Sequence, residues 1–179
     1  MMCVLPLLTM RLFAEERRQK TDQLLFTSPV TLTGIVTAKF LAAFTVFAGG
    51  ALILPVYGLV LSAMTDVNWL IIIGNFAGLL ALGTIFISIG ILISSLTENQ
   101  MIAAILSLLI NVMFFIGSLI TSLIQVPVVS DIMKALSVFD RYSEFALGIF
   151  RIGTVLFFVS CAAVFLFFTV RVLDSRRYS

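Results

Sequence analysis

Long runs of residues without any charge constrain this chain more than any other feature. Two charged residues, Asp66 and Glu98, interrupt the stretch from Phe40 to Ser130. The charge-free runs cover residues 40–65, 67–97, 99–130 and 152–170. A helix needs about 20 apolar residues to cross a bilayer, so each run fits one span and is too short for two. We therefore expect an all-α, polytopic membrane protein with spans near residues 38–63, 68–95, 100–125 and 153–172.

The composition excludes most soluble proteins. Hydrophobic residues make up 61% of the chain and charged residues 11%, and the mean hydropathy is +1.19. A soluble domain of this size could not bury so much apolar surface. Disordered chains are poor in apolar residues, so disorder is excluded as well. The net charge of +2 is small, and the basic residues lie mainly near the two ends, which indicates membrane topology rather than nucleic-acid binding.

Known catalytic and nucleotide-binding motifs are missing from the sequence. Histidine is absent, and neither Cys3 nor Cys161 belongs to a CxxC pair, so we expect two buried thiols and no metal site. No GxxxxGK[ST], HExxH or GxSxG motif occurs, so the sequence predicts neither ATP binding by this chain nor an enzyme. There is also no pair of carboxylates in mid-membrane and no evident internal repeat, which argues against a secondary carrier.

Lysine and arginine predict the orientation. Eight of these residues fall on the side that carries both termini, and three fall in the loop 126–151 on the other side. Since cytoplasmic loops are enriched in Lys and Arg, both termini are predicted to be cytoplasmic, in a cell membrane.

Two segments are predicted to lie outside the bilayer. Residues 11–28 are the most polar part, and they predict a short cytoplasmic helix ending near Thr27, before Pro29. This helix either rests on lipid headgroups or docks onto a cytoplasmic partner. Residues 128–151 predict an external amphipathic helix, either interfacial or a lid over an exit. Tyr142, Phe145 and Phe150, in the later part of this segment, are expected to form an interfacial aromatic belt.

A few small or polar residues stand out inside the spans. Pro55 predicts a kink in the first span. Gly74 and Gly78 form a GxxxG pattern, which permits close helix packing. Asn111 lies near the middle of the third span, where a buried amide needs a partner or water. It either makes an interhelical hydrogen bond or lines a water-filled path together with its neighbours Ser107, Phe114, Phe115 and Ser118.

The segment EERRQKTDQLLFTSPVTLTGIVTAKF resembles the cytoplasmic loop of ABC-2 type permeases, the membrane subunits of a class of ABC exporters. The residues that match the family pattern are Glu15–Arg18, Thr21, Leu24–Leu25, Ser28–Pro29–Val30 and Lys39. Lys20 and Ala38 stand where the family has glycine. The C-terminal part resembles the gliding-motility-type branch through Phe139, Asp140, Phe145, Gly148 and Arg176–Arg177.

The resemblance implies a six-span family fold in which this chain lacks the first two spans, so that residues 1–10 are the end of a helix. It implies that a coupling helix seats in a separate cytoplasmic ATPase, which binds ATP and Mg. The coupling residues are then Lys20, Thr21, Asp22, Gln23, Leu24, Leu25 and Phe26. It also implies a second permease subunit and a substrate path along residues 100–125, capped by the segment 128–151.

Three functions remain open on the sequence. The first is the permease subunit of an ATP-driven ABC-2 type exporter. The second is a membrane scaffold that anchors an ATPase or an envelope assembly without transport, or a truncated permease without function. The third is a carrier that works without ATP, which would be insensitive to changes such as Leu24→Glu.

Overall fold

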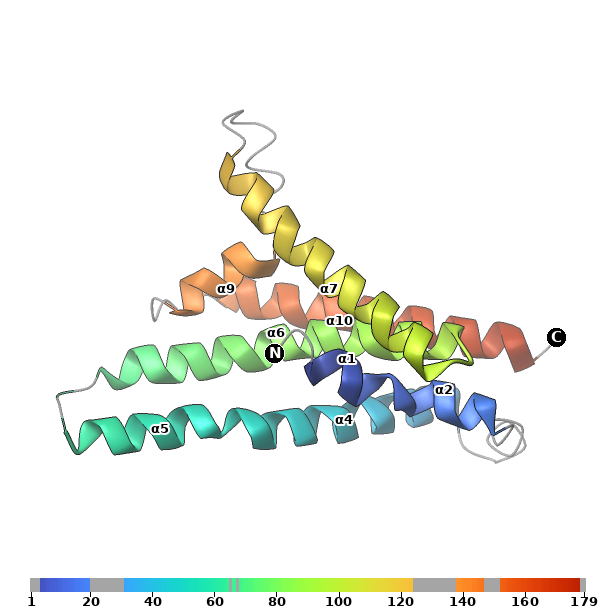
Figure 1. The fold of residues 1–179 in the computed structure, drawn as a ribbon, viewed down its shortest axis with the longest axis horizontal. Coiled ribbons are helices and arrows are strands. Elements are labelled where there is room, and N and C mark those ends of the chain that lie inside the picture. Colours follow the sequence, from blue (N-terminus) through green and yellow to red (C-terminus); the bar gives the residue numbers. More distant parts are fainter. Residues whose placement is uncertain are drawn as a thin grey trace.

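The described part of the computed structural model is built from helices and contains no strand (Figure 1). The structure describes residues 4–19, 31–64, 66, 68–123, 138–146 and 152–177. Their helices are α1 Val4–Thr9, α2 Arg11–Arg18, α4 Leu32–Ala51, α5 Ile53–Ser62, α6 Trp69–Leu96, α7 Gln100–Leu123, α9 Val138–Ala146 and α10 Ile152–Arg177. These helices include four candidate membrane spans. α4 and α5 together form the first, and α6, α7 and α10 form one each. The predicted all-α class with four membrane helices is confirmed.

Polar side chains mark where three of the long helices begin. Thr31 Oγ1 accepts a hydrogen bond from Gly34 N at 3.3 Å, and Asn68 Oδ1 accepts one from Leu70 N at 3.1 Å. Asn99 Oδ1 accepts one from Met101 N at 2.9 Å. Such caps satisfy amide groups that have no partner in the first helical turn. The cap at Thr31 starts α4 at Leu32, earlier than the span predicted near residue 38.

Pro55 interrupts the first spanning helix only locally. α4 ends at Ala51 and α5 begins at Ile53, with Leu52 between them. Proline has no amide hydrogen, so Ala51 loses the hydrogen bond that residue 55 would otherwise donate. Leu52 N still reaches Ala48 O at 3.1 Å, and Val56 N reaches Leu52 O at 3.3 Å. The two helices continue along nearly the same line, so the predicted kink is a break of one residue with little bend (Figure 1).

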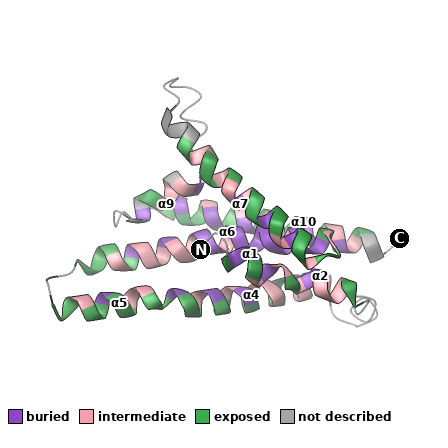
Figure 2. Ribbon diagram, in the orientation of Figure 1, coloured by how far each residue is buried: buried purple, intermediate pink, exposed green. Residues whose placement is uncertain are grey.

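The core of the molecule lies along α6. In its most apolar stretch 61% of residues are buried, against 17% in each of the other three candidate spans, and Figure 2 shows the buried residues gathered along this helix. Side chains of neighbouring helices pack directly against glycines of α6. A Cβ added at Gly83 would lie 2.1 Å from the Phe47 ring, and one at Gly90 would lie 2.1 Å from Thr9 Oγ1. Small residues therefore let α4 and α1 approach α6 closely.

α7 crosses the other helices obliquely, and its later part diverges from them (Figure 1). Helix α9 packs against both α6 and α7. Residues 124–137 and 147–151, which include most of the predicted segment 128–151 and Phe150, lie outside the described residues. Phe145 was predicted in an interfacial belt, and this is wrong: it is 1% exposed because it packs into the space left by Gly78.

Candidate coupling and transport sites

The predicted coupling residues follow α2 directly in the chain. Lys20, Thr21, Asp22, Gln23, Leu24, Leu25 and Phe26 lie outside the described residues. Helix α2 ends at Arg18, with Gln19 as its C-cap, and the predicted helix end near Thr27 lies outside the described residues. The described structure therefore shows how α2, the helix that precedes the predicted coupling residues, contacts the rest of the protein.

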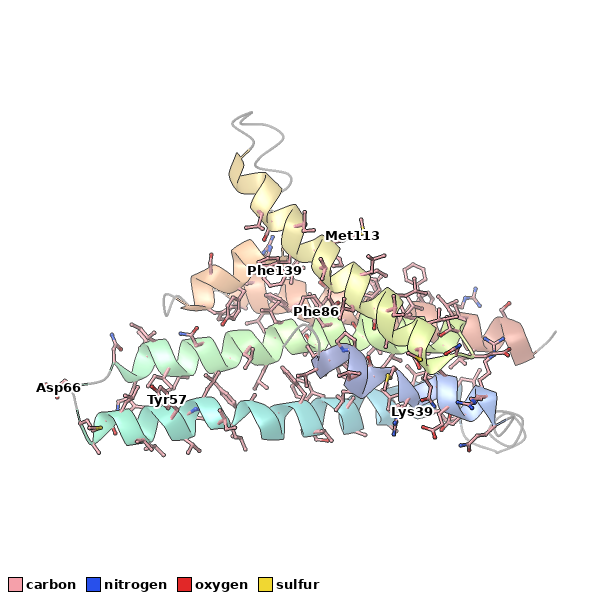
Figure 3. The ribbon with its side chains drawn as sticks, viewed as in Figure 1. Lys39, Tyr57, Asp66, Phe86, Met113 and Phe139 are labelled. Carbon is pink, nitrogen blue, oxygen red and sulfur yellow. The ribbon has the colours of Figure 1, made fainter. Side chains whose placement is uncertain are left out.

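Lys39 of α4 holds one side of α2. Its ammonium contacts the carboxylate of Glu16 and the backbone oxygen of Leu12. It also lies over the Phe13 ring, 4.0 Å from the ring centroid. A cation satisfied by a carboxylate, a carbonyl and an aromatic face can remain partly buried near the end of a membrane helix. The sequence marked Lys39 as part of a family motif, and the structure adds that it connects α4 with α2 (Figure 3).

Arg17 connects α2 to the turn between α6 and α7. Its guanidinium lies 2.7 Å from a Glu98 carboxylate oxygen and donates to Leu96 O at 3.2 Å. The Glu98 side chain is 65% exposed, so this ion pair contributes about 0–1 kcal/mol and mainly defines position. Together, Lys39 and Arg17 connect α2 with α4 and with the end of α6.

Two of the predicted path residues share the buried side of α7. Ser107 is 2% exposed and Asn111 is 1% exposed. The Ser107 hydroxyl donates to Ala103 O of its own helix at 2.8 Å. Within the part of the chain that the structure describes, the buried Asn111 Oδ1 has no hydrogen-bond partner. An unsatisfied amide oxygen in an apolar environment costs about 1–3 kcal/mol of folding free energy. Asn111 is therefore the residue of α7 whose burial most needs an explanation.

The other predicted path residues are Phe115, which contacts α9, and Phe114 and Ser118, which do not share the burial of Ser107 and Asn111. Phe115 is 41% exposed and meets Phe139 of α9 edge-on, with ring centroids 5.4 Å apart. Phe139 in turn lies 5.9 Å from Phe86 of α6 (Figure 3). Phe114 is partly buried against the core, and the Ser118 hydroxyl donates to Phe115 O at 2.8 Å. Only Ser107 and Asn111 are therefore brought together as buried polar groups.

The GxxxG residues lie on the buried part of α6. Gly74 and Gly78 are both buried. A Cβ added at Gly78 would lie 2.7 Å from Phe145 Cβ and 3.1 Å from Tyr142 Cδ2. Tyr142 also reaches α6 through its hydroxyl, which is 3.4 Å from Asn75 Oδ1. The neighbour at Gly78 is thus the short helix α9.

Further candidate sites are few among the described residues. Between α1 and α4 there is an apolar hollow of about 220 Å³. Its lining residues are Val4, Leu5, Leu8, Val46, Phe47 and Gly50. No group of three His, Cys, Asp or Glu side chains that could hold a metal ion occurs in the described ranges. Cys161 is a free, half-buried thiol of α10. None of these features supplies a polar anchor for a ligand.

Sequence reasoning missed Ser94, which lies near the end of α6. Its hydroxyl contacts the start of α2, more than 70 residues away in sequence. A serine in an apolar helix usually bonds to its own backbone, so nothing in the sequence distinguishes Ser94 from Ser88 or Ser95.

Four candidate spans, three of which pack around the buried helix α6, define an α-helical, multi-pass integral membrane protein. A family model described as ABC-2 family transporter protein matches residues 1–173. The chain therefore belongs to the ABC-2 transporter family, which supports a permease role in an ABC transporter. The family is a membrane transport component and is not itself the ATPase. Searches of curated proteins and of solved structures gave no match.

Proposed function

We propose that this chain is the permease subunit of an ATP-driven ABC-2 type exporter. A separate cytoplasmic ATPase subunit binds ATP and Mg, and residues 20–26 dock onto it. The observation that carries this proposal is the family match, which includes both the coupling segment and the helices around it. The way α2 is held supports it, because a segment that transmits force needs a base fixed to the membrane helices.

The orientation and the assembly are part of the same proposal. The ion pair of Arg17 with Glu98 joins α2 to the α6–α7 turn, and Asp66 lies at the opposite end of the bundle (Figure 3). Placing the α2 end in the cytoplasm puts most Lys and Arg residues there. The exposed apolar faces of α4, α5 and α7 are then covered by lipid and by a second permease subunit. The path lies along α7, with Ser107 and Asn111 as its polar groups and Phe114, Phe115 and Ser118 beside them.

The docking step can be tested with Leu24. The tagged chain is expressed in its native host, and the ABC ATPase that co-purifies is identified by mass spectrometry. Leu24→Glu should reduce recovery of that ATPase at least tenfold, because a charge replaces an apolar anchor of the contact. Leu24→Met keeps an apolar side chain of similar size and should leave recovery unchanged.

Two results would contradict the proposal. Equal recovery of the ATPase with Leu24→Glu would show that residues 20–26 are not the contact. Absence of any ABC ATPase from the preparation of a well-folded chain would reject the exporter subunit itself. A melting temperature within about 2 °C of wild type confirms that the variants are folded, since 1 kcal/mol shifts it by roughly 2–4 °C in a chain of this size.

A further inference from the structure

The first turn of α2 has no cap from its own sequence. Met10 occupies the N-cap position and makes no side-chain hydrogen bond to the helix. The first amides of any helix lack partners within that helix. Phe13, the third residue of α2, is 5% exposed, so water does not satisfy its amide. Another part of the protein must therefore supply the acceptor.

Ser94 of α6 supplies it. The Ser94 hydroxyl oxygen accepts hydrogen bonds from Phe13 N and Ala14 N, both at 3.1 Å. The same hydroxyl donates to Met10 O at 3.0 Å. A hydroxyl has one hydrogen to donate and two lone pairs that accept, so every hydrogen-bonding position of Ser94 is used on the α1–α2 junction. We call these three contacts the Ser94 bridge.

The Ser94 bridge connects the start of α2 to the last turns of α6. It lies between the close approach of Thr9 to Gly90 and the contact of Arg17 with Leu96 O. These contacts run from Thr9 of α1 to Arg17 of α2, and along fewer than two turns of α6, from Gly90 to Leu96. Ser95 differs, since its hydroxyl donates to Leu92 O of its own helix at 2.7 Å. Ser95 is also buried, at 2% exposed, and within the described residues its hydroxyl makes no hydrogen bond outside α6.

We propose that Ser94 is a positioning residue for energy coupling, and this rests on the proposed function. When the ATPase displaces residues 20–26, α2 moves with them. The Ser94 bridge passes that movement to α6, the helix against which the other spans pack. Without the bridge, α2 can turn or slide against α6, and the displacement is lost before it reaches the membrane helices.

The first arm of the test examines the bridge without any partner. Hydrogen exchange is followed in the purified chain in lipid nanodiscs. Ser94→Ala should accelerate exchange across residues 10–18 by about tenfold, because the buried Phe13 amide loses its acceptor and the start of α2 loses its contacts with Ser94. Ser95→Ala should not change it. Ser94→Cys keeps the volume with a weaker acceptor and should give an intermediate rate, which covers the case in which Ser94→Ala folds poorly. Unchanged exchange in the Ser94 variants would overturn the bridge.

The second arm examines coupling in the complex with its ATPase. Spin labels at Ile73→Cys on α6 and Met113→Cys on α7, in a Cys3→Ala/Cys161→Ala background, report the distance between these exposed positions. Trapping with ATP and vanadate should shift this distance in the Ser95→Ala complex. In the Ser94→Ala complex the ATPase should still bind and hydrolyse ATP, and the shift should be lost.

The two arms separate the possible failures. An equal shift in both complexes would overturn the role of Ser94 in coupling. If no ATPase binds the wild-type chain while Ser94 still protects residues 10–18, the proposed function is wrong, and the coupling role falls with it. A loss of ATPase binding in Ser94→Ala alone would also overturn it, because a positioning residue should leave docking intact.

Discussion

At the scale of a single residue, an experiment on Asn111 can distinguish a transport path from a purely structural role of its amide. Its amide oxygen is buried and has no hydrogen-bond partner among the described residues. A path residue must meet water in at least one state of the transporter. We expect Asn111→Cys, in a background without Cys3 and Cys161, to react with the water-soluble reagent MTSET in membrane vesicles. Thiols react as thiolates, which need water around them.

The matched control for Asn111 is on the same helix. Leu109 is 53% exposed in the chain and is predicted to face lipid. Leu109→Cys should react at least tenfold more slowly, because a thiol in lipid stays protonated. Equal, negligible rates at both positions, with and without ATP, would reject the path and leave a buried interhelical amide. The comparison depends only on how water reaches positions 111 and 109, so it requires no knowledge of the substrate.

At the scale of the helix, Gly78 decides whether α9 can dock. Its missing Cβ leaves room for Phe145 and Tyr142. Gly78→Val should push α9 away from α6 and cost about 1–3 kcal/mol, as overpacked sites do. Hydrogen exchange across residues 138–146 should then be roughly 5- to 150-fold faster, since exchange follows local undocking. α6 itself should keep its protection.

Gly153→Val is the control for the α9 experiment. A Cβ at Gly153, near the start of α10, has no neighbour within 4 Å, so it adds a branched residue to a helix without a clash. Exchange across residues 138–146 should stay at the wild-type rate in this variant. The same fast exchange in both variants would show that general destabilisation, and not the Gly78 contact, controls α9.

The helices also show which parts of the fold could be predicted from the sequence. Charge-free runs locate the spans, because a charge in the bilayer is costly wherever it lies. They do not reveal that α6 is central: lipid is as apolar as a protein core, so buried and lipid-facing spans have similar hydropathy. Glycines at positions 78, 83 and 90 were the available signal for close packing. The Ser94 bridge joins segments far apart in the chain, so local patterns could not predict it.

At the scale of the whole molecule, the charges predict how the bundle lies in the membrane. Arg17, Lys39 and Glu98 are joined through contacts at the α2 end, and Asp66 lies at the far end of α5 (Figure 3). The four candidate spans cover 20–31 residues, and a bilayer requires about 20, so they are long enough for both ends to reach the aqueous phases. The orientation then follows from which end faces the cytoplasm.

Cysteine labelling in intact cells measures that orientation directly. Asp66→Cys should react with a membrane-impermeant maleimide added outside, in a background without Cys3 and Cys161. Gln19→Cys, at the end of α2, should react only after the membrane is permeabilised. The reverse pattern would place α2 and the segment 20–26 outside the cell. No cytoplasmic ATPase could then reach them, so this measurement tests the topology on which docking, the Ser94 bridge and the direction of coupling all depend.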